Sequence, residues 1–191
     1  MRNTSFFYIL YTHMRISKQG DILLTELNLR NHCCCFTGHR PEKLNLPEFM
    51  VHYILDQKIR EAIDDGYQTF ITGMARGPDI WAAELVLKYR AFGNPIRLVC
   101  AVPYKGVETR WSTEWQERYR LVLRCANEVK FICRRYSPDC FQIRNKWMVD
   151  HSDRLIAVYN GSSGGTQNTL NYAILQGLSV VFVHPHIEGY L

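Results

Sequence analysis

The chain has 191 residues, of which 47% are hydrophobic and 21% are charged. This composition excludes disordered and fibrous chains and predicts one globular domain with a sizeable core. The formal net charge of +5, from 23 Lys and Arg against 18 Asp and Glu, suits an anionic small ligand as readily as nucleic acid. Because the densest basic spot, Arg134-Arg135, is only a pair, we do not expect nucleic acid to be the ligand.

The first 32 residues have no counterpart in the pattern that follows. The aromatic run from Phe6 to Tyr11 is too short to span a bilayer, and no small-residue cleavage site follows it, so we expect neither a membrane anchor nor a signal peptide. We predict a poorly ordered extension over residues 1–32. An added strand, helix or partner-binding arm is the alternative. Residues 33–191 then form a single domain.

Seven cysteines include the adjacent run Cys33-Cys34-Cys35, and no C-x-x-C motif occurs, so no disulfide framework is indicated. Successive side chains of a strand point to alternate faces, so these three cysteines with His32 and His39 cannot all reach one metal ion. We therefore predict buried, small apolar cysteines, no metal site and a reducing, cytoplasmic location.

From residue 33 onward, short apolar runs alternate with segments of helical period. Strands are predicted at residues 33–36, 69–71, 96–101, 129–133, 155–158 and 180–183, and helices at 47–66, 78–92, 108–126, 141–149 and 166–177. Strands that alternate with helices imply parallel pairing and right-handed crossovers. The predicted fold class is therefore α/β, a three-layer sandwich with a mostly parallel central sheet.

The stretch from Arg154 to Gly177 has the pattern of a strand, a glycine-rich loop and a helix. Its glycines permit backbone conformations and close ligand approach that other residues prevent. The first turn of the helix, residues 167–169, has no acidic residue, which favours a phosphate at the positive end of the helix. A tight turn that binds nothing is the alternative. The side chains expected to pack this helix are Leu170, Ala173, Ile174 and Leu175.

Ligands of parallel sheets bind beyond the carboxyl ends of the strands, so loops that are far apart in sequence should meet at one edge. Those loops are rich in Gly, Arg, Thr and Tyr, which indicates a pocket for an anion or nucleotide. The candidate ligand-binding residues are Thr37, Gly38, His39, Arg40, Gly73, Arg76, Gly77, Asp79, Tyr104, Arg144, Asn145, Asn160, Gly161, Gly164, Gly165 and Thr166.

Several motifs together resemble the SLOG superfamily of Rossmann-like proteins, and most closely its YpsA-like branch of largely uncharacterised bacterial proteins. They are Thr37 to Pro41, Thr72 to Asp79, Arg144-Asn145 with Met148 to Asp150, Ser152-Asp153, and Gly164 to Thr166. The resemblance covers about residues 33 to 184. The superfamily takes in the DNA-processing protein Smf/DprA and the lonely guy enzymes, so the resemblance implies a Rossmann-like fold and a nucleotide-derived ligand held by the glycine loops.

In lonely guy enzymes an Arg, three residues and then a Met precede a Gly-Thr loop, and a catalytic Glu follows three residues after that Thr. Arg144, Met148 and Gly165-Thr166 match this pattern, but Thr169 stands where the Glu is expected. Threonine cannot act as a carboxylate, so cleavage of a nucleotide by that mechanism is not implied. Whether the protein is an enzyme is left open, and the candidate catalytic residues are Glu108, Asp79 and Arg144.

Single residues at the strand ends have alternative roles. Arg40 could clamp a phosphate or form a surface ion pair, and we expect the clamp. Arg144 needs either a ligand or an internal acid such as Asp150, and we expect the ligand. Arg76 suits a solvated loop, and His39 suits either proton transfer or hydrogen bonding.

The acidic and aromatic residues near the strand ends are assigned separate roles. Asp79 is expected to cap its helix, and Glu108 is a candidate general base. Tyr104 is the predicted base-stacking residue. The aromatic residues at helical spacing are expected in the core; they are Trp111, Trp115 and Tyr119.

We expect a cytoplasmic protein that binds a nucleotide or an ADP-ribose-like derivative as a sensor or regulator, with no further cofactor. A hydrolase that cleaves an N-glycosidic or phosphate bond of such a ligand is the first alternative. Single-strand nucleic-acid binding is the second. A protein partner or self-association is left open.

Overall fold

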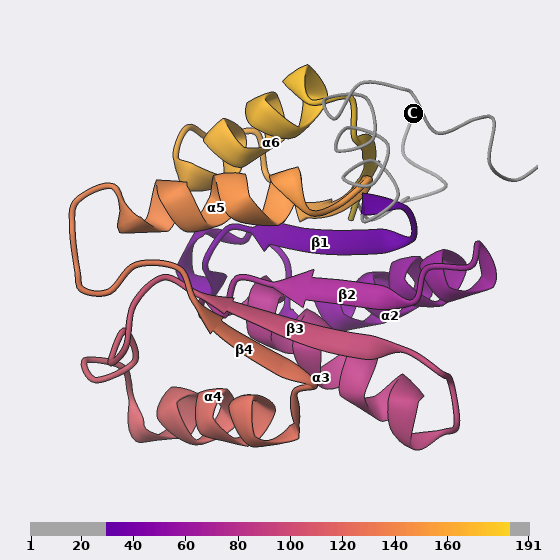
Figure 1. The fold of residues 1–191 in the computed structure, drawn as a ribbon, viewed down its shortest axis with the longest axis horizontal. Helices are drawn as coiled ribbons and strands as arrows, with labels where there is room; N and C mark the ends of the chain where they lie inside the picture. The colour runs from indigo at the N-terminus through magenta and orange to yellow at the C-terminus, as the bar shows by residue number, and fades with distance from the viewer. Residues whose placement is uncertain (1–29, 184–191) are drawn as a thin grey trace, which may run out of the picture. The chain divides into compact units, whose positions relative to one another are not determined.

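The computed structural model describes residues 30–183, so most of the predicted N-terminal extension lies outside the described residues, and its order stays a prediction. Strands and helices alternate through this part of the chain (Figure 1). The strands are β1 (Cys33–Gly38), β2 (Thr69–Thr72), β3 (Arg97–Val102), β4 (Glu128–Phe131), β5 (Arg154–Val158) and β6 (Ser179–Phe182). The helices are α2 (Glu48–Asp64), α3 (Pro78–Ala91), α4 (Thr113–Cys125), α5 (Cys140–Asp150) and α6 (Gly165–Leu175), with a 3₁₀ turn, η1 (Pro41–Lys43).

The six described strands form one sheet in the order β4-β3-β2-β1-β5-β6, and every neighbouring pair is parallel. The predicted α/β class is therefore confirmed, and the sheet is wholly parallel within these residues. The strand order reverses at β1, which lies between β2 and β5. In open α/β sheets, ligands bind in the crevice at such a reversal, beyond the carboxyl ends of the strands.

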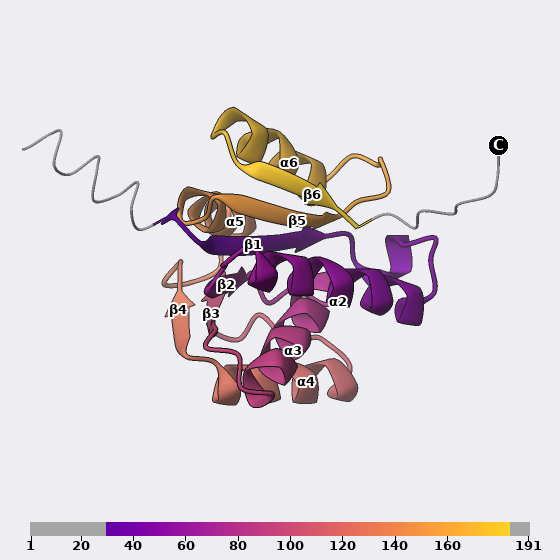
Figure 2. The same ribbon diagram turned by 90° about the vertical axis from the view of Figure 1, so that its right-hand side faces the viewer.

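Adjacent cysteines of β1 contribute to two separate cores on opposite faces of the sheet. Cys34 packs with residues of α2, α3 and α4, whereas Cys35 packs with residues of α5 and α6. Figure 2 shows the same division, with α5 and α6 on one side of the sheet and α2, α3 and α4 on the other. The expected alternation of the cysteine side chains is thus confirmed. No group of His, Cys, Asp and Glu within residues 30–183 could hold a metal ion.

No helix between residues 30 and 183 is long and apolar enough to cross a membrane.

The helix predicted at 108–126 begins later than expected, at Thr113. Gly106 adopts a left-handed φ of +88°, and the N–H of Trp111 bonds to the carbonyl of Glu108 in a turn. Because these turns occupy residues 103–112, Glu108 and Trp111 lie in a loop beside the sheet edge. The spacing of the aromatic residues continued across the turn, which is why periodicity placed the start too early.

The packing face of α6 also differs from the prediction. Leu170 and Ala173 are buried, but Ile174 and Leu175 are 61% and 80% exposed. Two threonines share the buried face instead, at a spacing of three to four residues from Leu170 and Ala173. They are Thr166 and Thr169.

Candidate functional site

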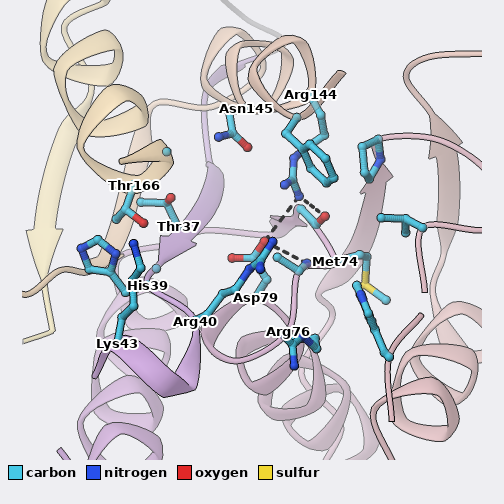
Figure 3. Close-up of a pocket in the computed structure, with 18 of the residues that line it drawn as sticks. Thr37, His39, Arg40, Lys43, Met74, Arg76, Asp79, Arg144, Asn145 and Thr166 are labelled. Atoms are coloured by element: carbon cyan, nitrogen blue, oxygen red, sulfur yellow. Dashed lines mark hydrogen bonds and ion pairs between the residues drawn. The ribbon is translucent and has the colours of Figure 1, made fainter. Parts of the chain in front are cut away.

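A cavity of about 760 Å³ opens at the carboxyl edge of the sheet (Figure 3). It lies between the loops that follow β1, β2 and β3 and the first turns of α5 and α6. Its predicted lining residues are Thr37, Gly38, His39, Arg40, Gly73, Arg76, Asp79, Tyr104, Arg144, Asn145, Gly165 and Thr166, and the others are Glu42, Lys43, Met74, Ala75, Pro103, Val107, Arg110, Trp111, Ser112 and Phe141. The predicted convergence of distant loops is therefore seen, whereas ligand binding by these residues stays a prediction.

Four predicted ligand-binding residues do not line the cavity: Gly77, Asn160, Gly161 and Gly164. Gly77 has a left-handed φ of +91°, and a Cβ there would lie 2.7 Å from Cδ of Pro41. Asn160 donates through Nδ2 to the carbonyl of Lys43 at 2.6 Å. Both residues therefore shape loops around the cavity.

The cationic wall of the cavity is formed by Arg40, Lys43 and Arg76, from the loops after β1 and β2, while Arg110 lines the cavity near Tyr104. Arg40 is exposed, and neither it nor Lys43 forms an ion pair with any residue in the described range. Arg76 pairs with Glu42 at 3.1 Å across the loops after β1 and β2, and its part in ligand binding stays a prediction. Lys43 follows Pro41 in the η1 turn, a signal that could have added it to the predicted site.

The N-terminus of α6 faces the same wall. Gly164 is the N-cap residue, and the first turn holds no acidic side chain, so unpaired N–H groups and the helix dipole favour an anion here. Gly165 has no positive φ, and within the described residues an added Cβ would meet no heavy atom within 4 Å outside its own helix backbone and its chain neighbours. The fold itself does not require glycine at position 165, whereas close approach of a ligand would.

Arg144 belongs to α5 and contacts the loop after β2. It is buried, with 4% of its surface exposed. Its Nη1 donates to the carbonyl oxygen of Gly73 and pairs with Oδ2 of Asp79 at 3.5 Å. The internal acid that pairs with Arg144 is Asp79, not Asp150, which was the example named as the alternative to a ligand. The expected ligand stays a prediction. Nε of Arg144 is buried and has no hydrogen-bond partner among the described residues.

Burial shifts both members of this pair away from their charged forms. It raises the pKa of Asp79, and the nearby Arg144 guanidinium opposes that shift. It lowers the pKa of Arg144, with Asp79 acting in the opposite sense. Asp79 also accepts a hydrogen bond from the backbone N–H of Ala75 at 3.2 Å. Asp79 makes no capping bond to α3, whose N-cap is Gly77. Its carboxylate instead accepts from the loop that precedes the helix, so the expected helix-capping role is not seen.

The opposite wall of the cavity is aromatic. Tyr104 meets Phe141 edge-to-face at 6.0 Å between ring centroids, and Tyr136 at 5.5 Å. Burial raises the pKa of the Tyr104 hydroxyl, so this group is a neutral donor at neutral pH. Trp111, expected in the core, packs against Tyr119 and also lines the cavity.

His39 is buried beside the glycine-rich loop and stacks on Tyr159 at 5.3 Å. Its Nε2 lies 3.4 Å from Oγ of Ser162. Burial, and then the charge of Lys43, lowers the pKa of His39. The imidazole is therefore a neutral hydrogen-bonding group at pH 7.

Two positions bear on catalysis. Glu108, a candidate base, does not line the cavity, and its buried Oε2 has no hydrogen-bond partner in residues 30–183. Thr169 is buried; its hydroxyl donates to the Gly165 carbonyl and accepts from Nδ2 of Asn145, both at 2.8 Å. The hydroxyl of Thr169 is thus used within the protein.

The sheet order and the cavity at its reversal define a Rossmann-like α/β protein with a polar site at the carboxyl edge. A model of the YspA SLOG family matches residues 34–178, and the chain belongs to that family. This confirms the family that the sequence motifs indicated.

The relatives of this chain include two bacterial proteins. The uncharacterized SPbeta prophage-derived protein YoqJ of Bacillus subtilis (strain 168) is 34% identical over 119 residues, which cover 54% of this chain and 68% of YoqJ. A UPF0398 protein of Shouchella clausii (strain KSM-K16) is 29% identical over 71% of this chain and 77% of its own length.

Two solved structures of DNA processing protein A share the fold. The protein from Streptococcus pneumoniae aligns with a TM-score of 0.58 at 16% identity, covering 87% of this chain and 54% of that one. This chain therefore spans about half the length of that relative. The Helicobacter pylori protein, whose structure concerns its single-stranded DNA binding mode, aligns with a TM-score of 0.56 at 15% identity, covering 82% of this chain and 66% of that one.

Proposed function

We propose that the protein binds a nucleotide or a nucleotide derivative such as ADP-ribose in the cavity at the carboxyl edge of the sheet. We further propose that it acts as a sensor or regulator that transmits occupancy to a partner. The observation that carries this proposal is that a single cavity has a cationic wall and an aromatic wall.

The cationic wall suits the phosphates of such a ligand. Arg40 and Lys43 offer charges that no described side chain neutralises, and the N-terminus of α6 adds backbone donors next to them. Arg144 adds a further guanidinium to the lining of the cavity. Arginine forks and helix N-termini are the groups with which proteins bind phosphate.

The aromatic wall suits the base. The aromatic side chains that line the cavity opposite the cationic wall are Tyr104, Phe141 and Trp111. Stacking of a base on an aromatic ring is worth about 1–3 kcal/mol. The volume of about 760 Å³ lies within the usual range for small-ligand sites, roughly 300–1,000 Å³. A mononucleotide or dinucleotide would fill it with both ends engaged.

A thermal-stability screen tests the proposal. Whole nucleotides and ADP-ribose should raise the melting temperature of the protein. Pyrophosphate, which would contact only the cationic wall, and adenosine, which would contact only the aromatic wall, should raise it much less. A ligand at a hundred times its Kd stabilises the protein by about 2.7 kcal/mol. If no member of the panel shifts the melting temperature, the proposed ligand class is wrong.

The variant Arg40→Ala tests whether the cationic wall binds the phosphates. Because Arg40 is exposed and forms no ion pair in the described range, the variant should fold normally and lose the stabilisation by nucleotides. Arg97→Ala is the matched control, since Arg97 is also exposed but begins β3 at the opposite edge of the sheet. Arg144→Ala should also abolish the gain, with an additional loss of stability. If the Arg40 and Arg144 variants both keep the gain, the site is misassigned.

A hydrolase is less well supported. The two carboxylates of the cavity lining are both engaged, Asp79 by Arg144 and Glu42 by Arg76, and Glu108 lies outside the lining. Incubation with each ligand followed by chromatography of the products tests this alternative. Release of a free base or of phosphate would favour it.

Single-strand nucleic-acid binding has support from the structural neighbours, which weakens our expectation from charge alone. DNA processing protein A of Helicobacter pylori binds single-stranded DNA, and Arg110, Arg134 and Arg135 of this chain follow strands at the same edge as the cavity. Binding of an oligonucleotide should then weaken steeply with salt, by about 0.7 log units per phosphate contact per log unit of salt. ADP-ribose should compete only if the two ligands share the cavity.

A further inference from the structure

The strand β4 is an edge of the sheet, and among the described elements it pairs only with β3. All four of its residues are exposed, and Figure 2 shows it at the side of the molecule, away from the helices that cover the middle of the sheet. An unpaired edge presents free backbone N–H and C=O groups to any strand that can align with it.

The register identifies the outward backbone groups. Ile132 donates its N–H to the carbonyl of Val102, which is aligned with Phe131. Because the backbone groups of successive strand residues point to alternate sides, the N–H and C=O groups of Val129 and Phe131 point away from β3.

The side chains of the same residues are apolar and incompletely covered. Val129 and Phe131 are 36% and 48% exposed, and their partners in β3, Cys100 and Val102, belong to the core under α4. Leu121 of α4 is also half exposed. Exposed apolar side chains that gather along an open strand edge are typical of an interaction surface.

The charged residues of β4 favour pairing with a second copy of the same strand. Glu128 and Lys130 form an ion pair at 3.8 Å within the strand. In an antiparallel pairing centred on Val129, Glu128 of each copy lies opposite Lys130 of the other, so the strand complements itself. A pairing centred on Lys130 would place like charges together.

We infer that two copies of this chain associate through the open edge of β4, antiparallel and centred on Val129. The two sheets then continue into one another. The charge pattern of β4 is complementary to itself in this arrangement, which favours a second copy of the chain as the partner.

Sedimentation of the full chain at high micromolar concentration tests the inference. We expect a species of twice the 22.4 kDa chain mass that dissociates on dilution. Val129→Pro removes an outward N–H and leaves the bonds to β3 in place, so it should give a monomer with an unchanged melting temperature. A wild-type chain that stays monomeric would overturn the inference.

Charge exchange tests the register. Glu128→Lys and Lys130→Glu should each weaken self-association, since like charges then face each other across the two-fold axis. An equimolar mixture of the two variants should associate again, because their β4 strands are mutually complementary. Glu61→Lys breaks a comparable Glu–Lys pair on α2 and should change nothing. A dimer that survives both single exchanges and the proline would place the interface elsewhere.

Discussion

The guanidinium of Arg144 lies against the backbone of Gly73 and donates to its carbonyl oxygen. This contact joins α5 on one face of the sheet to the loop after β2, at the floor of the cavity. A Cβ on Gly73 would overlap Nη1 of Arg144 and lie 2.7 Å from Oδ2 of Asp79. An added methyl group at this position would therefore displace the buried ion pair.

Gly73→Ala should lower the free energy of unfolding by about 1–3 kcal/mol, because overpacking displaces the ion pair. Urea denaturation followed by circular dichroism measures the loss. Gly165→Ala is the matched control for stability: its Cβ meets no atom within 4 Å, and alanine in a helix is neutral or stabilising by up to about 1 kcal/mol. The same control should weaken nucleotide binding at the α6 terminus. Equal losses of stability in both variants would contradict the overlap.

Asp79→Ala should cost about 3–5 kcal/mol of stability, because it leaves the buried Arg144 charge without its carboxylate partner. Glu42→Ala removes the other carboxylate of the cavity, whose side chain is 54% exposed in its pair with Arg76. Loss of such an exposed pair should cost about 0–1 kcal/mol. Chemical denaturation of the two variants in parallel measures the difference, and similar costs would show that burial does not set the strength of the Asp79 pair.

His39 should make stability depend on pH. Its pKa in the folded protein is lowered from 6.5 by burial and by Lys43, so below pH 6.5 the unfolded chain binds a proton that the folded chain does not. The stabilising contribution is therefore complete above pH 6.5 and is lost as the pH falls toward the folded pKa. Denaturation above and below pH 6.5 should show a smaller pH dependence in His39→Gln than in the wild type.

Tyr104→Leu or Phe141→Leu should weaken nucleotide binding by about 1–3 kcal/mol, the stacking energy of a base, and leave pyrophosphate binding unchanged. Isothermal titration calorimetry with both ligands separates these effects. Phe92→Leu removes an exposed ring at the end of α3 and should bind both ligands as the wild type does. Equal loss of pyrophosphate binding would mean that the aromatic wall also holds the phosphates.

The sheet and the meeting of its loops could be predicted because local pattern determines them. Short apolar runs identify parallel strands, and parallel strands place their carboxyl ends at one edge. Side-chain pairing across the molecule could not be predicted in the same way. Asp79 and Arg144 are 65 residues apart, so their ion pair could not be expected from proximity in the sequence.

The missed lining residues had weaker signals. Lys43 follows the predicted Arg40 within one tight turn, and Trp111 was placed in a helix because its spacing to Trp115 is four residues. Only the backbone reversal at Gly106 shows that Trp111 belongs to a loop. Ile174 was expected to be buried because it is apolar, but the two threonines of α6 take the inner face.

The cavity walls come from separate connections, each anchored by its own strand or helix of the sheet frame. Substitutions or length changes in one connection can therefore alter one part of the cavity lining without disturbing the other connections or the two hydrophobic cores. Proteins with the same sheet and helices can therefore differ in the shape and charge of this cavity, because surface loops tolerate changes in sequence and length best.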